Sequence, residues 1–357
     1  MKTRRRALTL GSAAILILSA ALSAQNNQPP PRKLSDADKK EIQTIQKLVD
    51  DAAIGQPAPN DLGLAWVRED LLKAQGNKQY LPFSVTIDPS KASTGKLSFY
   101  WRVVSKNPAP APAAAADAKK DKDAKDDKKS KPEYAYEDLN TIAVPSSQSG
   151  PMRISRSFTV APGAYDVFVL VKEPTPEKAS KNAPPQKAAL IKQTVTVPDL
   201  WNNELNTSTV IVAERIDPLP AALTPQQQAE RPYALGTMEI VPAVGTKFTK
   251  KAELSTFLLI YNAKTDAANK PDVSVEYNFY AKQGGTEKFF NKTNPQNLNA
   301  QTLPPDFDFA AGHQLQSGQA VPLASFPEGD YRLEIKVTDK TSGKSLTRDV
   351  NFTVAGR

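Results

Sequence analysis

The spacing of apolar residues changes along the chain and separates a short helical part from a long part with strand-like alternation. Within residues 35–55, SDADKKEIQTIQKLVDDAAIG, apolar residues recur three or four positions apart and so share one face of a helix: Ile42, Ile45, Val49 and Ala52. Ser35 is a candidate N-cap with Asp38 three residues later, and Gly55 follows the last periodic position. We expect this amphipathic helix to pack on its own module; a partner-binding or oligomerising helix is the alternative.

From Tyr80 the period becomes two, which is the spacing of residues on one face of a β-strand. In KLSFYWRVV, residues 96–104, every second residue is apolar: Leu97, Phe99, Trp101 and Val103. Similar short segments, bounded by proline, glycine and polar turns, continue to the end of the chain. The pattern predicts an all-β protein behind a short helical segment.

The strand pattern occurs twice. The segment that begins at Phe83, FSVTIDPSKASTGKLSFYWRVVSK, corresponds to the segment that begins at Phe257, FLLIYNAKTDAANKPDVSVEYNFYAK. Likewise APGAYDVFVLV at 161–171 corresponds to PEGDYRLEIKV at 327–337. Two copies of about seven short strands each predict two Ig-like or fibronectin-like β-sandwiches in tandem.

Each copy contains a Gly-x-Tyr motif in front of a strongly alternating strand: Gly163 with Tyr165, and Gly329 with Tyr331. The glycine permits a positive φ at the corner where the strand begins. The tyrosine has the register of the apolar residues of its strand, so we expect a buried ring whose hydroxyl reaches a backbone group, as in the tyrosine corner of Ig-like sandwiches. A sugar-stacking role for these tyrosines is the alternative, and the inward register argues against it.

These patterns divide the chain into four parts. Residues 1–24 have a basic start, an apolar stretch and small residues at the end, which is the layout of a secretory signal peptide; a retained N-terminal anchor is the alternative. Residues 25–58 hold a polar spacer and the amphipathic helix. The first sandwich spans 59–200, with an insert at 106–133 that is rich in Lys, Asp, Ala and Pro and that we expect to be disordered. The second sandwich spans 205–357.

The leader also changes the interpretation of the charge. Four of the 46 basic residues and none of the 38 acidic residues lie in the leader, so 42 basic and 38 acidic residues remain, a net charge of +4. Such a balance, with basic residues scattered along the chain, gives no reason to expect nucleic acid as a partner. The leader predicts an exported protein, in the periplasm, at the cell surface or outside the cell, with no membrane span after cleavage. The chain contains no cysteine, which excludes disulfides and thiol chemistry.

Residues that carry chemistry are scarce. His313 is the only histidine, and AAGHQLQSG around it has no nucleophile elbow, so we expect neither a Ser-His-Asp triad nor a zinc site. Asp306 and Asp308, two apart in PPDFDFAAGH, should share one strand face, with Phe307 and Phe309 on the other. The two carboxylates are weak candidates for a calcium site. Otherwise we expect no metal, no cofactor and no catalytic residues.

Several segments resemble the β-sandwich regions of secreted bacterial proteins that often carry a GWxTD domain: YLPFSVTIDP, TSTVIVAERI, FTKKAELSTFLLIYN and FPEGDYRLEIKVTDKTSGKSLTRDVNFTV. The resemblance covers mainly Leu205 to Val354. The GWxTD pentapeptide itself is absent. The resemblance therefore implies a sandwich protein of the cell envelope and no site residues.

Three functions remain open. The first is a non-enzymatic protein-binding or structural role in the envelope, with envelope proteins as partners that contact loops and exposed strand edges. The second is carbohydrate binding, for which the candidate ligand-facing aromatic residues are Trp66, Trp201, Phe289 and Phe290. The third is a divergent hydrolase, which needs two carboxylates that face each other across a cleft.

Overall fold

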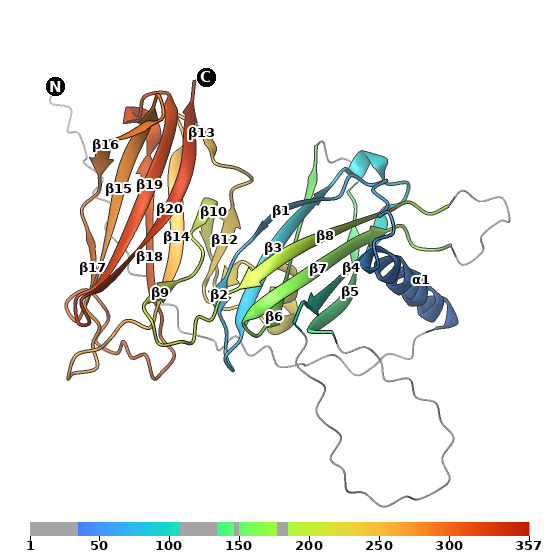
Figure 1. Ribbon diagram of the computed structural model, residues 1–357, viewed down its shortest axis with the longest axis horizontal. Coiled ribbons are helices and arrows are strands. Elements are labelled where there is room, and N and C mark those ends of the chain that lie inside the picture. The colour runs from blue at the N-terminus through green and yellow to red at the C-terminus, as the bar shows by residue number, and fades with distance from the viewer. Residues whose placement is uncertain (1–34, 108–133, 146–149, 177–184, 357) are drawn as a thin grey trace, which may run out of the picture. The chain divides into compact units, whose positions relative to one another are not determined.

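A computed structural model describes residues 35–107, 134–145, 150–176 and 185–356 (Figure 1). The predicted signal peptide and most of the predicted disordered insert lie outside these residues. Among the helices of the described residues, none is long and apolar enough to cross a membrane. The described chain consists mostly of strands arranged in several sheets, with one long helix, which confirms the prediction of an all-β fold.

The chain forms two compact units, which we describe separately. Of the described residues, the first unit comprises those within 35–199 together with Ala229–Pro232, and the second comprises Leu200–Gln228 together with 233–356. Each unit has two β-sheets that enclose one hydrophobic core. The short helix α2 (Pro225–Glu230) lies between β10 (Ile211–Pro218) and β11 (Ala234–Leu235), two strands of one sheet in the second unit.

In the first unit, one sheet is built around β3 (Gln79–Ile87). One edge of β3 pairs with β6 (Met152–Val160), and its other edge pairs with β1 (Ala65–Glu69) and with β2 (Leu72–Lys73). The other sheet has the order β5-β4-β7-β8: Tyr136–Ala143, Lys96–Ser105, Gly163–Lys172 and Ala188–Val197. A 3-10 turn, Pro89–Lys91, connects β3 to β4. The alternating residues of β4 point into the core between the sheets, as the period of two predicts: Leu97, Phe99, Trp101 and Val103.

Helix α1 (Asp36–Ala53) packs on the first unit, against the outer face of the β5-β4-β7-β8 sheet. Ser35 and Asp38 form a capping box: the Ser35 hydroxyl accepts from the Asp38 N–H at 3.1 Å, and the Ser35 N–H donates to the Asp38 carboxylate at 3.0 Å. Ile45 and Val49 of the helix are fully buried against Phe168 and Leu170 of β7. Strand β7 is therefore apolar on both faces, which explains its unbroken run VFVLV.

Charged residues at the rim of this helix–sheet contact form ion pairs. Arg102 Nη1 of β4 donates to Asp50 Oδ1 of α1 at 2.5 Å. The ammonium of Lys172, which is 4 % exposed, donates to Glu41 of α1 at 2.9 Å. Two cations on the outer sheet face are thus matched by carboxylates of the helix, so the helix completes the first unit.

In the second unit, one sheet has the order β11-β12-β10-β14-β18, with β9 paired to β14: Ala234–Leu235, Met238–Pro242, Ile211–Pro218, Glu253–Tyr261, Leu315–Pro322 and Asn206–Thr207. The facing sheet has the order β13-β20-β19-β15-β16, with β17 paired to β15: Lys247–Thr249, Lys344–Ala355, Gly329–Asp339, Val273–Gln283, Thr286–Lys292 and Gln296–Leu298. A 3-10 turn, Leu323–Ser325, joins β18 to β19. Figure 1 shows the long strands β15, β19 and β20 side by side.

Both Gly-x-Tyr motifs open the strand that carries them. Gly163 has φ +155° and Gly329 has φ +150°, a backbone region that residues with a side chain rarely adopt. The rings of Tyr165 and Tyr331 are buried. Tyr165 Oη donates to the carbonyl of Ala161 at 2.9 Å, and Tyr331 Oη donates to the carbonyl of Pro327 at 2.9 Å. The same bond, four residues back, closes the same corner in both units.

Candidate functional site

The second unit carries an open groove of about 1190 Å³ along strand β18. This volume is somewhat above the usual range for ligand sites, roughly 300–1,000 Å³. The groove is lined by β18, by the ends of β10 and β14, and by the segment 294–307. Amide side chains are prominent in its lining: Asn294, Gln296, Asn297, Gln314, Gln316 and Gln319.

Strand β18 is the last strand of its sheet. It pairs with β14 along its whole length, from Leu315 opposite Ile260 to Pro322 opposite Glu253, and within the described residues it has no strand on its other side. The carbonyl of Gly318 accepts a bond from Gln296 Nε2 at 2.7 Å, so the backbone of Gly318 points away from β14. Because backbone groups of successive residues point to alternate sides of a strand, those of Gln316 and Ala320 also point to the open side.

The inner side of β18 is held firmly. The hydroxyls of Tyr277 and Ser317 lie 2.8 Å apart, and Ser317 Oγ donates to Gln296 Oε1 at 2.6 Å. Burial raises the pKa of Tyr277 to about 12. A Cβ added at Gly318 would lie 2.5 Å from the carbonyl oxygen of Thr256, so the close approach of β14 requires glycine here. The open edge therefore belongs to a rigid strand.

The open edge of β18 has no charged residue. Its sequence is LQSGQAVP, whereas each other edge strand of at least five described residues carries charge: β1 (Arg68, Glu69), β5 (Glu137, Asp138), β6 (Arg153, Arg156), β8 (Lys192) and β16 (Glu287, Lys288, Lys292). Charged residues on an edge strand prevent unwanted pairing with other chains. Strand β18 lacks this protection, and it is the edge strand that lines the groove.

One end of the groove is acidic. A β-bulge between Ala213 and Arg215 leaves Glu214 outside the regular pairing of β10, and bulges of this kind redirect a side chain. Glu214 and Glu253 both line the groove. Arg215 lines it too, but its guanidinium donates to Asp217 at 2.8 Å and is already neutralised. The groove thus combines amide groups, two carboxylates and an open strand edge.

The four predicted ligand-facing aromatic residues do not form one site. Trp66 is stacked on Phe83 of the core at 5.1 Å, and its indole N–H donates to Glu69 at 2.6 Å. Trp201 is half-buried in the segment between β8 and β9. Phe290 packs into the second core against Phe326, with ring centroids 4.8 Å apart. Phe289 is 58 % exposed.

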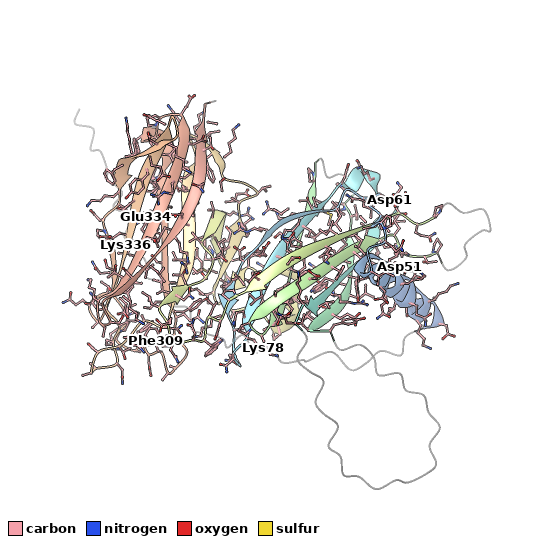
Figure 2. The ribbon with its side chains drawn as sticks, in the orientation of Figure 1. Asp51, Asp61, Lys78, Phe309, Glu334 and Lys336 are labelled. Atoms are coloured by element: carbon pink, nitrogen blue, oxygen red, sulfur yellow. The ribbon has the colours of Figure 1, made fainter. Side chains whose placement is uncertain are left out.

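Phe289 lies on the outer face of the second unit's other sheet. Its ring meets the edge of Tyr280 at 5.9 Å, and the guanidinium of Arg332 lies 4.5 Å from the Tyr280 ring. Burial alone would lower the pKa of Arg332, but its ion pairs with three carboxylates raise it: Asp349, Glu334 and Glu287. Glu334 and Lys336 continue this charged face along β19 (Figure 2).

The segment 306–308 differs from the sequence expectation. Asp306 and Asp308 lie in turns and not on a strand, because Phe307 N–H donates to Pro304 O at 3.0 Å and closes the first turn. Asp308 Oδ1 accepts from the Ala310 N–H at 2.8 Å. His313 Nδ1 accepts from the Asp308 N–H at 3.0 Å, so the histidine closes this loop. Among the described residues, no group of three or more metal-ligating side chains is present.

No family model and no curated protein matches the chain. Among solved structures, Escherichia coli alpha-2-macroglobulin activated by porcine elastase is similar over 80 % of this chain and 22 % of its own, with 9 % identity and a TM-score of 0.22. Salmonella alpha-2-macroglobulin reacted with methylamine is similar over 84 % of this chain and 17 % of its own, with 12 % identity and a TM-score of 0.19. The chain thus spans about a fifth of the length of these proteins.

Proposed function

We propose that this chain is a non-enzymatic binding protein of the cell envelope, and that its second unit takes up an extended segment of a partner protein as an added strand beside β18. One observation carries the proposal: the long edge strand without charge is the one that lines the groove. Strand addition uses main-chain hydrogen bonds for affinity and pockets for alternate side chains for specificity. The outward N–H groups of Gln316, Gly318 and Ala320 and the outward carbonyls of Gln316 and Ala320 supply the main-chain bonds, whereas the Gly318 carbonyl already accepts from Gln296.

The energetics require both the edge and the groove. Each new backbone bond contributes roughly 0.5–1.5 kcal/mol net. A handful of such bonds offsets at most the lower part of the roughly 4–15 kcal/mol that association costs. Side-chain contacts with the groove must therefore supply the remainder. Its amides, and the carboxylates of Glu214 and Glu253, which form no ion pair within the described residues, favour a polar segment with a basic residue near these two glutamates.

The groove supports a carboxylate-dependent hydrolase less well than it supports strand addition. Such an enzyme needs two carboxylates on opposite sides of the reacting bond. Glu214 and Glu253 come from β10 and β14, which pair directly at Ala213 and Ser255, so both stem from one wall of the groove. We therefore prefer the binding role.

The test uses the mature full-length chain and extended decapeptides selected from a random displayed library. Ala320→Pro removes the N–H that points to the open side and leaves the ladder with β14 intact. Ala320→Val is the matched control, because Ala320 is exposed and valine keeps the N–H. We expect the selected peptides to bind the parent and Ala320→Val alike and to bind Ala320→Pro at least tenfold more weakly.

Hydrogen exchange gives an independent readout. A bound strand should protect the amide N–H groups of Gln316, Gly318 and Ala320, whereas those of Ser317 and Gln319 face β14 and are protected beforehand. Peptides that bind Ala320→Pro as well as they bind Ala320→Val, or that leave the three amides unprotected, would refute strand addition at β18.

A second candidate function is carbohydrate binding at Phe289. The observation that favours it is the exposed Phe289 ring on the outer face of its sheet, next to Tyr280 and the fixed guanidinium of Arg332. Stacking of a sugar ring on Phe289 would be lost in Phe289→Ala and kept in Phe289→Tyr. A glycan array probed with both variants tests this, and equal binding by Phe289→Ala and the parent excludes Phe289 as a platform.

A further inference from the structure

Arg156 of β6 is a cation inside the core of the first unit. It lies opposite Phe83 in the β3–β6 ladder, and it alternates with the core residues Ile154 and Phe158. Its side chain is 7 % exposed, and its guanidinium lies 5.5 Å from the Phe99 ring. Nη1 donates to the carbonyl of Ser155 at 2.8 Å, whereas Nε has no hydrogen-bond partner in the described part of the chain.

A second unpartnered donor belongs to the same aromatic cluster. Trp101 of β4 is 2 % exposed, and its indole N–H also has no partner in the described part of the chain. Its ring lies 5.6 Å from that of Phe99 and 6.3 Å from that of Phe83, the two rings that neighbour Arg156. Guanidinium and indole N–H groups only donate, so whatever satisfies both must be an acceptor.

Packing of the core does not require these two polar groups. An apolar side chain at position 156 would fill the inward position without the cost of a buried charge. No carboxylate forms an ion pair with Arg156 within the described ranges, although the charges of Glu230 and Asp138 act on it. Burial lowers the pKa of Arg156, and these two carboxylates oppose that effect only in part.

The edge strand β5 completes the surroundings. Asp138 pairs with Trp101 and Asn140 pairs with Phe99, so both polar side chains share the inward face of β5 with these rings. Strands β5 and β6 are edge strands of opposite sheets and contact each other. The inward face of β5 therefore adds a carboxylate and an amide at the edge of the sandwich where the two unpartnered donors lie.

We infer that this edge of the first unit is a binding site for the carboxylate group of a small ligand, which accepts from Arg156 Nε and from the Trp101 indole N–H. A planar carboxylate matches the side of a guanidinium, and charge-assisted bonds of this kind are the strong ones. A dianionic phosphate fits less well than a singly charged carboxylate, because Asp138 and Glu230 repel a double negative charge more strongly than a single one. Asp138 and Asn140 are placed to contact the polar part of the ligand, such as hydroxyls or an amide.

A carboxylate of this kind can come from a sugar acid or from the C-terminus of a peptide, and the experiment distinguishes the two. Sodium glucuronate and N-acetylglycine are the probes, and methyl glucoside and N-acetylglycine methyl ester are the uncharged controls. The mature full-length chain is labelled with 15N, and the three tryptophan indole N–H signals are followed at constant ionic strength. Trp101→Phe assigns the signal of Trp101.

We expect one of the two acids to shift the Trp101 indole signal saturably and its uncharged control to leave it unchanged. The Trp66 signal, whose N–H is bonded to Glu69, should stay in place. Arg156→Gln should abolish the shift, and Arg156→Lys, which keeps the charge but lacks Nε, should weaken binding at least tenfold.

A stability measurement separates this role from a structural one. Arg156→Met should leave Tm unchanged or raise it, because the variant removes an unpaired buried charge. A marked fall in Tm would mean that the guanidinium supports the fold. That result, or the absence of a saturable shift with either acid, or an equal shift with sodium chloride, would overturn the proposal. The site lies in the first unit and does not depend on strand addition at β18.

Discussion

The two tyrosine corners give the sharpest test of how the sequence determines this fold. Tyr165→Phe and Tyr331→Phe each remove a single hydroxyl that donates to a carbonyl four residues back at 2.9 Å. The rings are 5 % and 2 % exposed, and phenylalanine keeps their packing. The acceptors belong to Ala161 and Pro327, which are exposed, so water can reach each freed carbonyl. The loss should therefore equal that of an ordinary hydrogen bond, about 1 kcal/mol of unfolding free energy.

For units of this size, such a loss lowers Tm by roughly 2–4 °C. Differential scanning calorimetry of the mature chain is the assay. Tyr280→Phe is the matched control, because the Tyr280 hydroxyl has no hydrogen bond among the described residues and the ring contact with Arg332 survives in phenylalanine.

The two substitutions also belong to separate units, so their effects should add in the double variant. If Tyr165→Phe and Tyr331→Phe unfold at the temperature of Tyr280→Phe, the hydroxyl bond contributes nothing. The repeated Gly-x-Tyr motif would then reflect ring packing alone.

Other substitutions test other contacts. Burial raises the pKa of Tyr277 to about 12, whereas the tyrosine of an unfolded chain ionises near pH 10. The free energy of unfolding should therefore be unaffected by Tyr277 below pH 10 and fall by up to about 3 kcal/mol between pH 10 and 12. Tyr277→Phe should flatten this part of a series of urea-unfolding curves measured against pH. Ile45→Ala truncates a fully buried side chain of α1 that packs on the sheet, and it should lower the free energy of unfolding in urea by about 2–4 kcal/mol. Equal stability of variant and parent would show that α1 does not complete the first unit. Gly318→Ala should lower the free energy of unfolding of the second unit by more than about 1 kcal/mol in the same assay, because the alanine Cβ would lie 2.5 Å from the Thr256 carbonyl oxygen. An unchanged urea midpoint would contradict that close approach.

The features that the sequence predicts correctly all depend on neighbours along the chain. Alternation in KLSFYWRVV identifies the inward face of β4, and the stripe of α1 identifies the face that packs on the sheet. The repeat between the two halves identifies two sandwiches, because each copy needs both of its sheets to bury a core. Local patterns therefore suffice for the all-β class.

The groove could not be predicted in this way, because its walls come from segments that lie far apart in the sequence. Glu214, Gln296 and Gln316 line one groove only after β10, β14 and β18 have paired in one sheet and β17 has paired with β15 in the facing sheet. The strand predicted at 306–308 from alternating residues is wrong, because Pro304 and Pro305 precede the aspartates and the chain forms turns instead of a strand. The burial of Arg156 was not predicted, although the sequence indicates it: in RISRSFTV the arginine has the register of Ile154 and Phe158, which point into the core.

The contrast between β16 and β18 explains why an open edge is informative here. Strand β16 also ends a sheet and exposes Phe289, but a bulge at Phe290 breaks its pairing with β15, and Lys288 and Lys292 flank the aromatic pair. Both features hinder the addition of another strand. Strand β18 has a regular ladder and no charge, and its backbone is held by the contacts of Ser317 and Gly318. A regular edge of this kind would favour aggregation in a protein that had no use for it, so its retention beside a groove is the strongest physical reason to look for a partner strand there.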